Sequence, residues 1–221
     1  MATSHGTPPA QGGRAAAAET KRRQILDAAV HVFARQGFHG CRVSDIADEA
    51  GVAYGLVYHY FDSKSEILDT LFLERWDVLL ALIAEVDGRD LPARDKLYEI
   101  AAFIIESYRH DPELMKVIIV EVTRAANSFG RTHLGKISDA YDGIAAIVGR
   151  AQASGEFRDD VTAQFAALAF YGAIEQALTG WIFDLLPGGD REYEQAKHFV
   201  VATICDGLQS AAHDRASGPA L

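Results

Sequence analysis

The sequence of 221 residues predicts an all-α fold. Apolar residues recur every three or four positions along most of the chain, which is the spacing of one face of an amphipathic helix. Glycine, proline and aspartate interrupt this pattern at helix-length intervals, as they do where helices end. No segment alternates apolar and polar residues in the manner of a half-buried strand. These observations favour nine helices in two domains, a small three-helix module followed by a larger helical domain.

The first helix is expected to run from Lys21 to Gln36, with Thr20 as its N-cap and Gly37 at its end. Residues 1–19 contain Pro8-Pro9 and Gly12-Gly13, so we expect a flexible arm there. The apolar stripe of this first helix consists of Ile25, Ala29, Val32 and Phe33.

Residues 43–61 are typical of a helix, a sharp turn and a second short helix. Gly51 lies where the chain needs a positive φ to leave the first of these helices, and glycine adopts that conformation cheaply. The small Ala47 allows the second helix to approach closely. In such a helix-turn-helix, the N-terminal residues of the second helix reach the base edges of DNA. The positions expected to hold the two helices together are Ile46, Ala47, Ala50, Val52, Val57 and Tyr60.

The outward-facing residues of this motif are the candidates for DNA contacts. We expect Tyr54, Tyr58 and His59 to reach bases and phosphates, while Gly55 allows close approach of the backbone. Tyr58 could alternatively pack inside the module, whereas Tyr60 and Phe61 are assigned to packing. The full set of predicted DNA-binding residues is Arg42, Ser44, Ala53, Tyr54, Gly55, Tyr58, His59 and Lys64, of which Arg42 and Lys64 are expected to hold phosphates.

Residues 21–70 resemble the tetracycline-repressor (TetR) family of bacterial transcription regulators. The resemblance is carried by Ile25 to Phe38, by Val43-Ser-Asp-Ile-Ala, by Ala50-Gly-Val-Ala-Tyr-Gly and by Leu56 to Leu68. It implies a homodimeric repressor that binds a double-stranded operator and whose C-terminal helices bind a small effector.

Two positions depart from the pattern of the family. Cys41 stands where threonine is usual, and Ala53 stands where serine is usual, so two hydroxyl groups that could cap a helix or contact phosphate are missing. After residue 110 the chain resembles the fatty-acid-degradation branch, whose effectors are long-chain acyl-CoA thioesters. The alternatives are a repressor of a drug-efflux gene that responds to aromatic or cationic compounds, and a helical interaction module that does not bind DNA.

The formal net charge of −10 is unevenly distributed. Residues 1–64 carry seven Lys or Arg against six Asp or Glu, whereas the other 157 residues carry 14 against 25. The motif is therefore close to neutral, and the acidic remainder discourages nonspecific binding to DNA. Arg14 and Lys21 to Arg23 leave open that the N-terminal arm touches a minor groove.

The larger part of the chain is expected to be helical throughout. Accordingly, the sequence predicts an arm (1–19), a DNA-binding domain (20–66), an effector-binding and dimerisation domain (67–214) and a tail (215–221). Three later helices are expected from Lys64 to Asp87, from Leu91-Pro92 to Arg109, and from Asp111-Pro112 to a break at Ser128–Gly130. Another follows this break and ends at about Ser154. The last two are expected from a cap at Asp159 or Asp160 to Leu186, and from Arg191 to Ala212.

Aromatic residues spread over these helices could line an apolar effector pocket, although most could equally be plain core. Arg124 could hold the anionic end of an effector or form an ion pair with Glu121. The candidate effector-binding residues are Trp76, Phe103, Met115, Arg124, Tyr141, Tyr171 and Trp181.

One stripe of the eighth helix, with part of the ninth, could form a four-helix dimer interface. By spacing alone these residues could also be ordinary core; the resemblance favours dimerisation. The candidates are Phe165, Leu168, Ala169, Gly172, Ala173, Gln176, Thr179, Phe183, Ile204 and Leu208, with Gly180 and Phe199 beside them.

The sequence argues against an enzyme. Its eight histidines are scattered, and no metal-ligand spacing, glycine-rich phosphate loop or Gly-x-Ser-x-Gly motif is present. We therefore expect no catalytic residue, metal or cofactor. Cys41 and Cys205 suggest no disulfide framework, which favours a reducing cytoplasm. Neither a signal segment nor a membrane-spanning run is expected.

Overall fold

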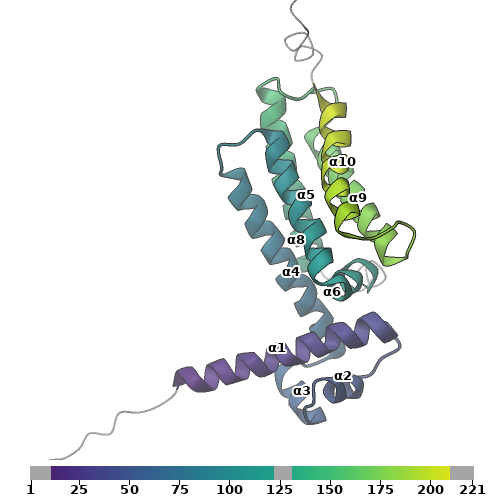
Figure 1. Cartoon of the computed structure of the whole chain (residues 1–221). Coiled ribbons are helices and arrows are strands. Elements are labelled where there is room, and N and C mark those ends of the chain that lie inside the picture. The colour runs from purple at the N-terminus through teal and green to yellow at the C-terminus, as the bar shows by residue number, and fades with distance from the viewer. Residues whose placement is uncertain (1–10, 122–130, 210–221) are drawn as a thin grey trace, which may run out of the picture. The chain divides into compact units, whose positions relative to one another are not determined.

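The computed structural model describes residues 11–121 and 131–209 (Figure 1). Within those ranges the chain forms nine α-helices and one π-helix, and the remaining regular pairing is an isolated bridge between Phe157 and Gln209. The prediction of an all-α, nine-helix chain is confirmed. The chain divides into two compact units, Met1–Leu71 and Phe72–Leu221, each with its own core.

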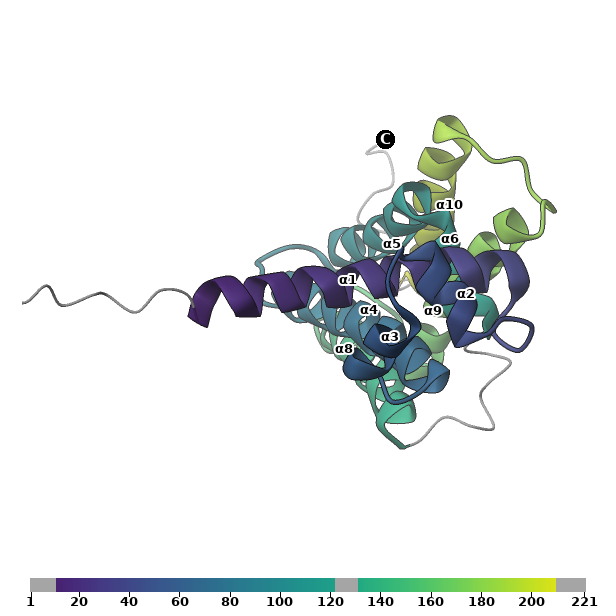
Figure 2. The same ribbon diagram turned by 90° about the horizontal axis from the view of Figure 1, so that it is seen from below.

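The first unit contains α1 (Gln11–Gln36), α2 (Val43–Glu49), α3 (Tyr54–Tyr60) and the first turns of α4 (Lys64–Asp87). The view from below brings α3 to the front of this unit (Figure 2). Its core consists of side chains that are almost fully buried, contributed by all four helices. They include Ile25, Leu26, Phe33, Ile46, Val57, Ile67 and Leu68.

Helix α1 begins ten residues earlier than the sequence suggested, so the expected arm over residues 1–19 is wrong from Gln11 onward. The reason is local, because the run from Ala15 to Ala18 consists of the best helix former. Thr20 is inside the helix and is not its N-cap: its hydroxyl donates to the carbonyl oxygen of Ala16 at 2.9 Å. Residues 1–10 lie outside the described part of the chain.

The second unit contains the rest of α4 and all later helices. These are α5 (Ala93–His110), α6 (Pro112–Lys116), the π-helix η1 (Val117–Glu121), α8 (Arg131–Ala153), α9 (Ala163–Ile182) and α10 (Asp190–Leu208). α8 packs along α9, and α5 packs along α10. Gly143 on α8 allows close contact with α4, because a Cβ atom at this position would lie 2.7 Å from Cγ2 of Ile83.

Several predicted helix ends hold and others do not. α6 begins at Pro112, as expected, and Asp111 caps it by accepting a hydrogen bond from the Leu114 N–H at 2.9 Å. Helix α9 is capped by Thr162 and not by Asp159 or Asp160, since the Asp160 carboxylate pairs with Arg158. α9 also ends at Ile182, four residues before the expected Leu186, and α10 ends at Leu208. The predicted break at Ser128–Gly130 and the predicted tail lie outside the described residues.

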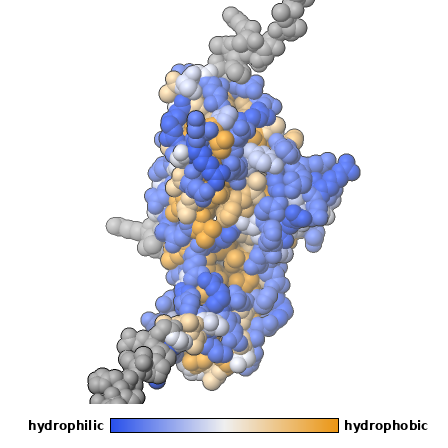
Figure 3. All heavy atoms as spheres, turned by 60° about the vertical axis from the view of Figure 1, so that its left-hand side comes forward, coloured by the Kyte–Doolittle hydropathy of each residue, from blue (hydrophilic) through white to orange (hydrophobic). Residues whose placement is uncertain are grey.

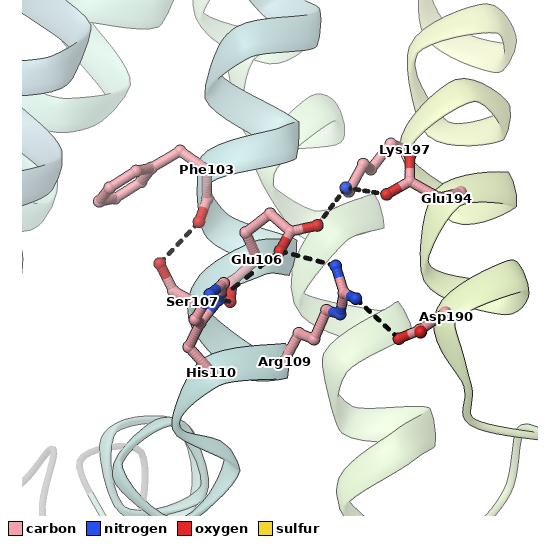
Figure 4. A network of polar contacts seen from close by, with 8 residues as sticks. All are labelled: Phe103, Glu106, Ser107, Arg109, His110, Asp190, Glu194 and Lys197. Atoms are coloured by element: carbon pink, nitrogen blue, oxygen red, sulfur yellow. Dashed lines mark hydrogen bonds and ion pairs between the residues drawn. The ribbon is translucent and has the colours of Figure 1, made fainter.

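A polar network joins α5 to α10 (Figure 4). The ammonium group of Lys197, a residue only 4% exposed, donates hydrogen bonds to the carboxylates of Glu106 and Glu194. Burial lowers the pKa of Lys197, but the hydrogen bonds to Glu106 and Glu194 outweigh this effect and the net pKa is raised. Beside it, Arg109 bridges Glu106 and Asp190. The network therefore fixes one side of α5, while the ring of Phe103 points away from it (Figure 4).

Candidate functional site

The turn between α2 and α3 places the predicted reading helix. Gly51 has φ of +62°, as the sequence analysis expected of the residue that leaves α2. Val57 on α3 and Ile46 on α2 are fully buried, so the two helices share a dry contact. A further contact, not expected from the sequence, links α1 to the end of α2: the side-chain amide of Gln24 donates a hydrogen bond to the Ala50 carbonyl at 2.6 Å. These contacts hold the end of α2 and the turn that leads into α3.

The outward face of α3 carries two tyrosines. Tyr54 is 53% exposed and Tyr58 is 44% exposed, so Tyr58 does not pack inside the unit. Their rings meet edge to face at 5.1 Å and their hydroxyl oxygens are 3.3 Å apart. The hydrogen bond to Tyr54 raises the pKa of Tyr58, so the phenol stays protonated at neutral pH. Because Tyr54 donates to Tyr58, the Tyr58 hydroxyl keeps its proton for a base or phosphate, while the Tyr54 oxygen remains an acceptor.

The other predicted contacts on this surface differ in exposure. His59, Gly55 and Ala53 are exposed, and a Cβ atom on Gly55 would meet open space. Arg42 is also exposed, while Ser44 is half-buried. The main chain of Arg42 is held by Asp45, whose carboxylate accepts its N–H at 2.7 Å.

Lys64 has a different environment from the one expected. Its ammonium group donates to the carbonyl oxygens of Phe38 and of Cys41, the latter at 2.7 Å, and lies 4.6 Å from the ring centroid of Phe38. Two of its three N–H donors are thus used within the unit. These two bonds tie Lys64 to the loop before α2 and leave one donor, so its contact with a phosphate stays a prediction. Cys41 is buried, so its thiol belongs to the core.

A second candidate site is a cavity in the second unit. Four residues predicted to bind an effector line it together, namely Trp76, Phe103, Met115 and Tyr171. The cavity has four further lining residues that were not expected from the sequence, namely Arg75, Leu79, Ile104 and Ile118. The site therefore combines α4, α5, α6, the π-helix and α9. π-helical turns are frequently found at functional sites.

The lining is apolar except at one end. The ring of Tyr171 lies 5.8 Å from that of Trp76, and burial raises the pKa of Tyr171, so its phenol remains neutral. Arg75 is the charged side chain among the described lining residues, and its guanidinium lies 4.9 Å from the centroid of the Phe103 ring. Burial lowers the pKa of Arg75, opposed by the charge of Asp111. The cavity thus offers a cationic group beside an apolar interior.

Three predicted effector residues do not line this cavity. Tyr141 contacts it only indirectly, through an edge-to-face contact with Tyr171 at 5.4 Å. Trp181 lies elsewhere, stacked on Tyr108 at 5.6 Å and donating from its indole to the Pro187 carbonyl. Arg124 and the side chain of its predicted partner Glu121 lie outside the described part of the chain.

The predicted dimer face is largely exposed in the single chain. Phe165 is 64% exposed, Phe199 is 71% exposed, and Leu168 and Phe183 are about half exposed. A space-filling view shows apolar side chains gathered at the surface of the second unit (Figure 3). Of the other candidates, Ala169 and Gln176 are exposed, while Gly172, Ala173, Thr179 and Ile204 are half-buried.

Two residues of that prediction are wrong. Leu208 is only 7% exposed and belongs to the core of its own chain. Gly180 is also buried, and a Cβ atom on it would lie 2.6 Å from Cδ1 of Leu186. The small size of Gly180 therefore serves the loop after α9 and not a neighbouring subunit.

A helix-turn-helix with an exposed reading helix, followed by a helical unit with an apolar cavity, defines a ligand-responsive DNA-binding transcription regulator. Comparison with known families agrees. Residues 25–71 match the model of bacterial regulatory proteins of the tetR family, and residues 94–204 match the tetracyclin repressor-like C-terminal domain. The chain belongs to the tetR family of bacterial regulatory proteins, which are not enzymes.

Individual proteins of known function or structure are also similar to this chain. The chain is 31% identical to the fatty acid metabolism regulator protein of Bacillus subtilis over 79% of its own length and 87% of the relative's. It is 25% identical to the transcriptional repressor KstR2 of Rhodococcus jostii over 86% and 92% of the two chains. The crystal structure of FadR from Bacillus subtilis in complex with stearoyl-CoA superposes with a TM-score of 0.73 and 26% identity, covering 85% of this chain and 99% of that one.

The described residues were also compared with the features of membrane-spanning helices and of metal sites. None of the helices there is both long and apolar enough to cross a membrane. No group of three or more metal-ligating side chains occurs among them either.

Proposed function

We propose that this chain is a transcriptional repressor that binds a palindromic operator as a homodimer and releases it when a hydrophobic effector enters the cavity of the second unit. In this proposal the first unit reads DNA through Tyr54, Gly55, Tyr58 and His59, with Arg42 on a phosphate. The second unit binds the effector and a second copy of the chain. A regulator of this kind acts on DNA in the cytoplasm.

The observation that carries the proposal is that helix α4 belongs to both units. Its first turns bury Ile67 and Leu68 in the core of the first unit, and its later turns place Arg75, Trp76 and Leu79 in the wall of the cavity. A ligand that displaces the later turns therefore acts on the same helix that supports α3. Such a ligand lowers DNA affinity by its differential affinity for the two conformations.

Dimerisation supplies the geometry on which this mechanism depends. Two reading helices fit successive major grooves when they are about 34–36 Å apart, one turn of duplex. The exposed apolar side chains of α9 and α10 favour a two-fold interface built from the same surface on both copies. Because Phe165 and Phe199 are exposed in the single chain, burying them in a dimer removes apolar surface from water.

An acyl-CoA is the effector best supported. FadR of Bacillus subtilis, one relative of known structure, is complexed with stearoyl-CoA, and the cavity of this chain is mostly apolar. Its volume of about 30 Å³ holds about two water molecules, so a long chain must open it. An effector that needs this opening would select the open conformation, which links binding to helix movement.

A cationic aromatic drug is the second candidate effector. The aromatic lining, Trp76, Phe103 and Tyr171, would suit it. However, the guanidinium of Arg75 repels a cation in a partly desolvated site, so we place this alternative behind the acyl-CoA.

The test is an electrophoretic mobility shift with DNA from the promoter region of its own gene, titrated with dodecanoyl-CoA. We expect retarded DNA at low salt and its release by the thioester. His110→Ala, an exposed substitution in the second unit, is the control and should change neither result. Absence of a shift at low ionic strength would instead favour a helical interaction module that does not bind DNA, and release by a planar cation alone would favour the drug-responsive alternative.

A further inference from the structure

Arg75 differs from the five arginines of the second unit that pair with a carboxylate; Arg191, for which the described residues show no such pair, is exposed. Arg89, Arg94, Arg109, Arg150 and Arg158 each pair with a carboxylate. Among the described residues, Arg75 has no carboxylate within ion-pair distance, and its guanidinium lies over the face of the Phe103 ring. It is also half-buried, as Arg94 is, whereas Arg89, Arg109, Arg150 and Arg158 are exposed. This guanidinium is therefore desolvated without a compensating anion.

The charge of Arg75 persists in this environment. Although burial lowers its pKa, an arginine remains protonated at neutral pH. Asp111 is the acidic residue whose charge acts on it most strongly, yet the Asp111 carboxylate is engaged with the N-terminus of α6 through Leu114. A partly buried charge without a partner is costly, and a ligand oxygen that binds it removes part of that cost.

The position of Arg75 within the lining indicates which end of a ligand it would meet. Of the lining residues, Arg75, Phe103 and Tyr171 are partly exposed, but the Tyr171 phenol is buried, so Arg75 and Phe103 mark the end of the lining that water reaches. Trp76, Leu79, Ile104, Met115 and Ile118 are buried and form its apolar interior. A ligand with a polar head and an apolar chain fits this order, with its head at Arg75.

We propose that Arg75 binds the head-group oxygen of the effector, a carboxylate or thioester carbonyl at the end of an apolar chain that lies against Leu79, Ile104 and Ile118. This inference rests on the proposed role of the cavity as an effector site. Arg75 would then bind the anionic end of the effector, a role for which Arg124 was one candidate from the sequence. A free fatty acid and an acyl-CoA share this head-group chemistry, and the experiment below separates them.

The experiment measures binding of dodecanoic acid, dodecanoyl-CoA and 1-dodecanol by isothermal titration calorimetry. Arg75→Met keeps the length of the side chain and removes its charge and donors, and Arg75→Lys keeps the charge without the planar fork. Arg89→Met, which removes an exposed arginine paired with Glu85 and Glu99, is the matched control. Circular dichroism checks that each variant is folded. Trp76 fluorescence in a Trp181→Phe background reports whether a ligand enters the cavity, because the chain has two tryptophans.

We expect Arg75→Met to raise the Kd of the acid or the thioester about tenfold or more, while the Kd of 1-dodecanol changes little. A larger effect on the acid identifies a carboxylate head, and a larger effect on the CoA ester identifies a thioester. Arg75→Lys should lie between wild type and Arg75→Met, and it also carries the test if the methionine variant does not fold.

Two results would overturn the inference; the first leaves the proposed effector function intact, and the second does not. Equal losses for all three ligands, or none for any, would show that Arg75 does not recognise the head group, while the proposed effector function survives. Failure of the wild-type protein to bind any of the three ligands would overturn both the inference and the acyl effector.

Discussion

The two units build their candidate sites in opposite ways. In the first unit, the predicted DNA contacts all fall between Arg42 and Lys64, and two short helices with one glycine turn present them. In the second unit, the cavity draws on residues from Arg75 to Tyr171, contributed by α4, α5, α6, the π-helix and α9. A reading surface can thus be encoded locally, whereas an effector site depends on the packing of a whole domain.

The largest expected effects come from the two cores, and they test whether the units are separable. Phe170→Ala removes a fully buried side chain of the second unit and should cost about 3–5 kcal/mol in free energy of unfolding. Ile46→Ala should cost about 2–5 kcal/mol in the first unit. Urea unfolding gives the size of the loss, and hydrogen exchange locates it.

The informative comparison is functional. Ile46→Ala should weaken or abolish operator binding and leave dodecanoyl-CoA binding intact, because the cavity contains no residue of the first unit. If Ile46→Ala lost both operator binding and dodecanoyl-CoA binding, the two units would unfold together and not independently.

The next largest effect is expected from the network between α5 and α10. Lys197→Met removes the cation that two carboxylates share and should cost about 1.5–3 kcal/mol at neutral pH. Chemical denaturation of wild type and variant measures it. A Glu194→Gln variant, which removes one exposed partner, should lose less.

The same network predicts a pH dependence. The hydrogen bond from Lys197 holds the pKa of Glu106 below its ordinary value. Its stabilisation is therefore present above the unfolded-state pKa of about 4.3 and is lost as the pH falls through the lower folded-state value. The difference in unfolding free energy between wild type and Lys197→Met should accordingly shrink below that pH. A difference that stays constant from pH 7 to strongly acid solution would contradict this role of Glu106.

A smaller effect is expected at Lys64, and it separates two roles for one side chain. Lys64→Met removes hydrogen bonds to the carbonyl oxygens of Phe38 and Cys41 and should cost about 1 kcal/mol in stability. Operator affinity should fall as the loop loosens, with an unchanged dependence on salt. A phosphate contact would instead lower the slope of log affinity against log salt by about 1, as measured by fluorescence anisotropy at several salt concentrations.

The smallest effect on stability is expected on α3. Tyr54→Phe removes one of two exposed, mutually bonded hydroxyl groups and should change stability by less than about 0.5 kcal/mol. Operator affinity should nevertheless fall, because the hydroxyl group faces outward. Thermal unfolding and anisotropy measure the two quantities, with His110→Ala as the control. Unchanged affinity in both Tyr54→Phe and Tyr58→Phe would remove these hydroxyl groups from the interface.

Particular residues show how far the sequence reaches. Gly51 was identified as the turn because a positive φ is a local backbone demand, and Asp111 because a cap requires only the residues next to it. The sequence places Leu208 and Gly180 at an interface because both share a helical stripe with exposed residues, but both are buried in their own chain. Periodicity defines a stripe on a helix, but it does not say which neighbour covers each part of that stripe.

The amino-acid order was sufficient for the helical class, the helix-turn-helix and the outward tyrosines of α3, since all of these depend on interactions within a few turns of chain. The packing of distant helices settled the rest: Arg75 at the water-accessible end of an apolar cavity, Trp181 away from it, and Lys64 bonded to two carbonyl groups. Each of these outcomes depends on which groups meet across long sequence separations, where burial and the demand for hydrogen-bond partners select one arrangement among several with similar local patterns.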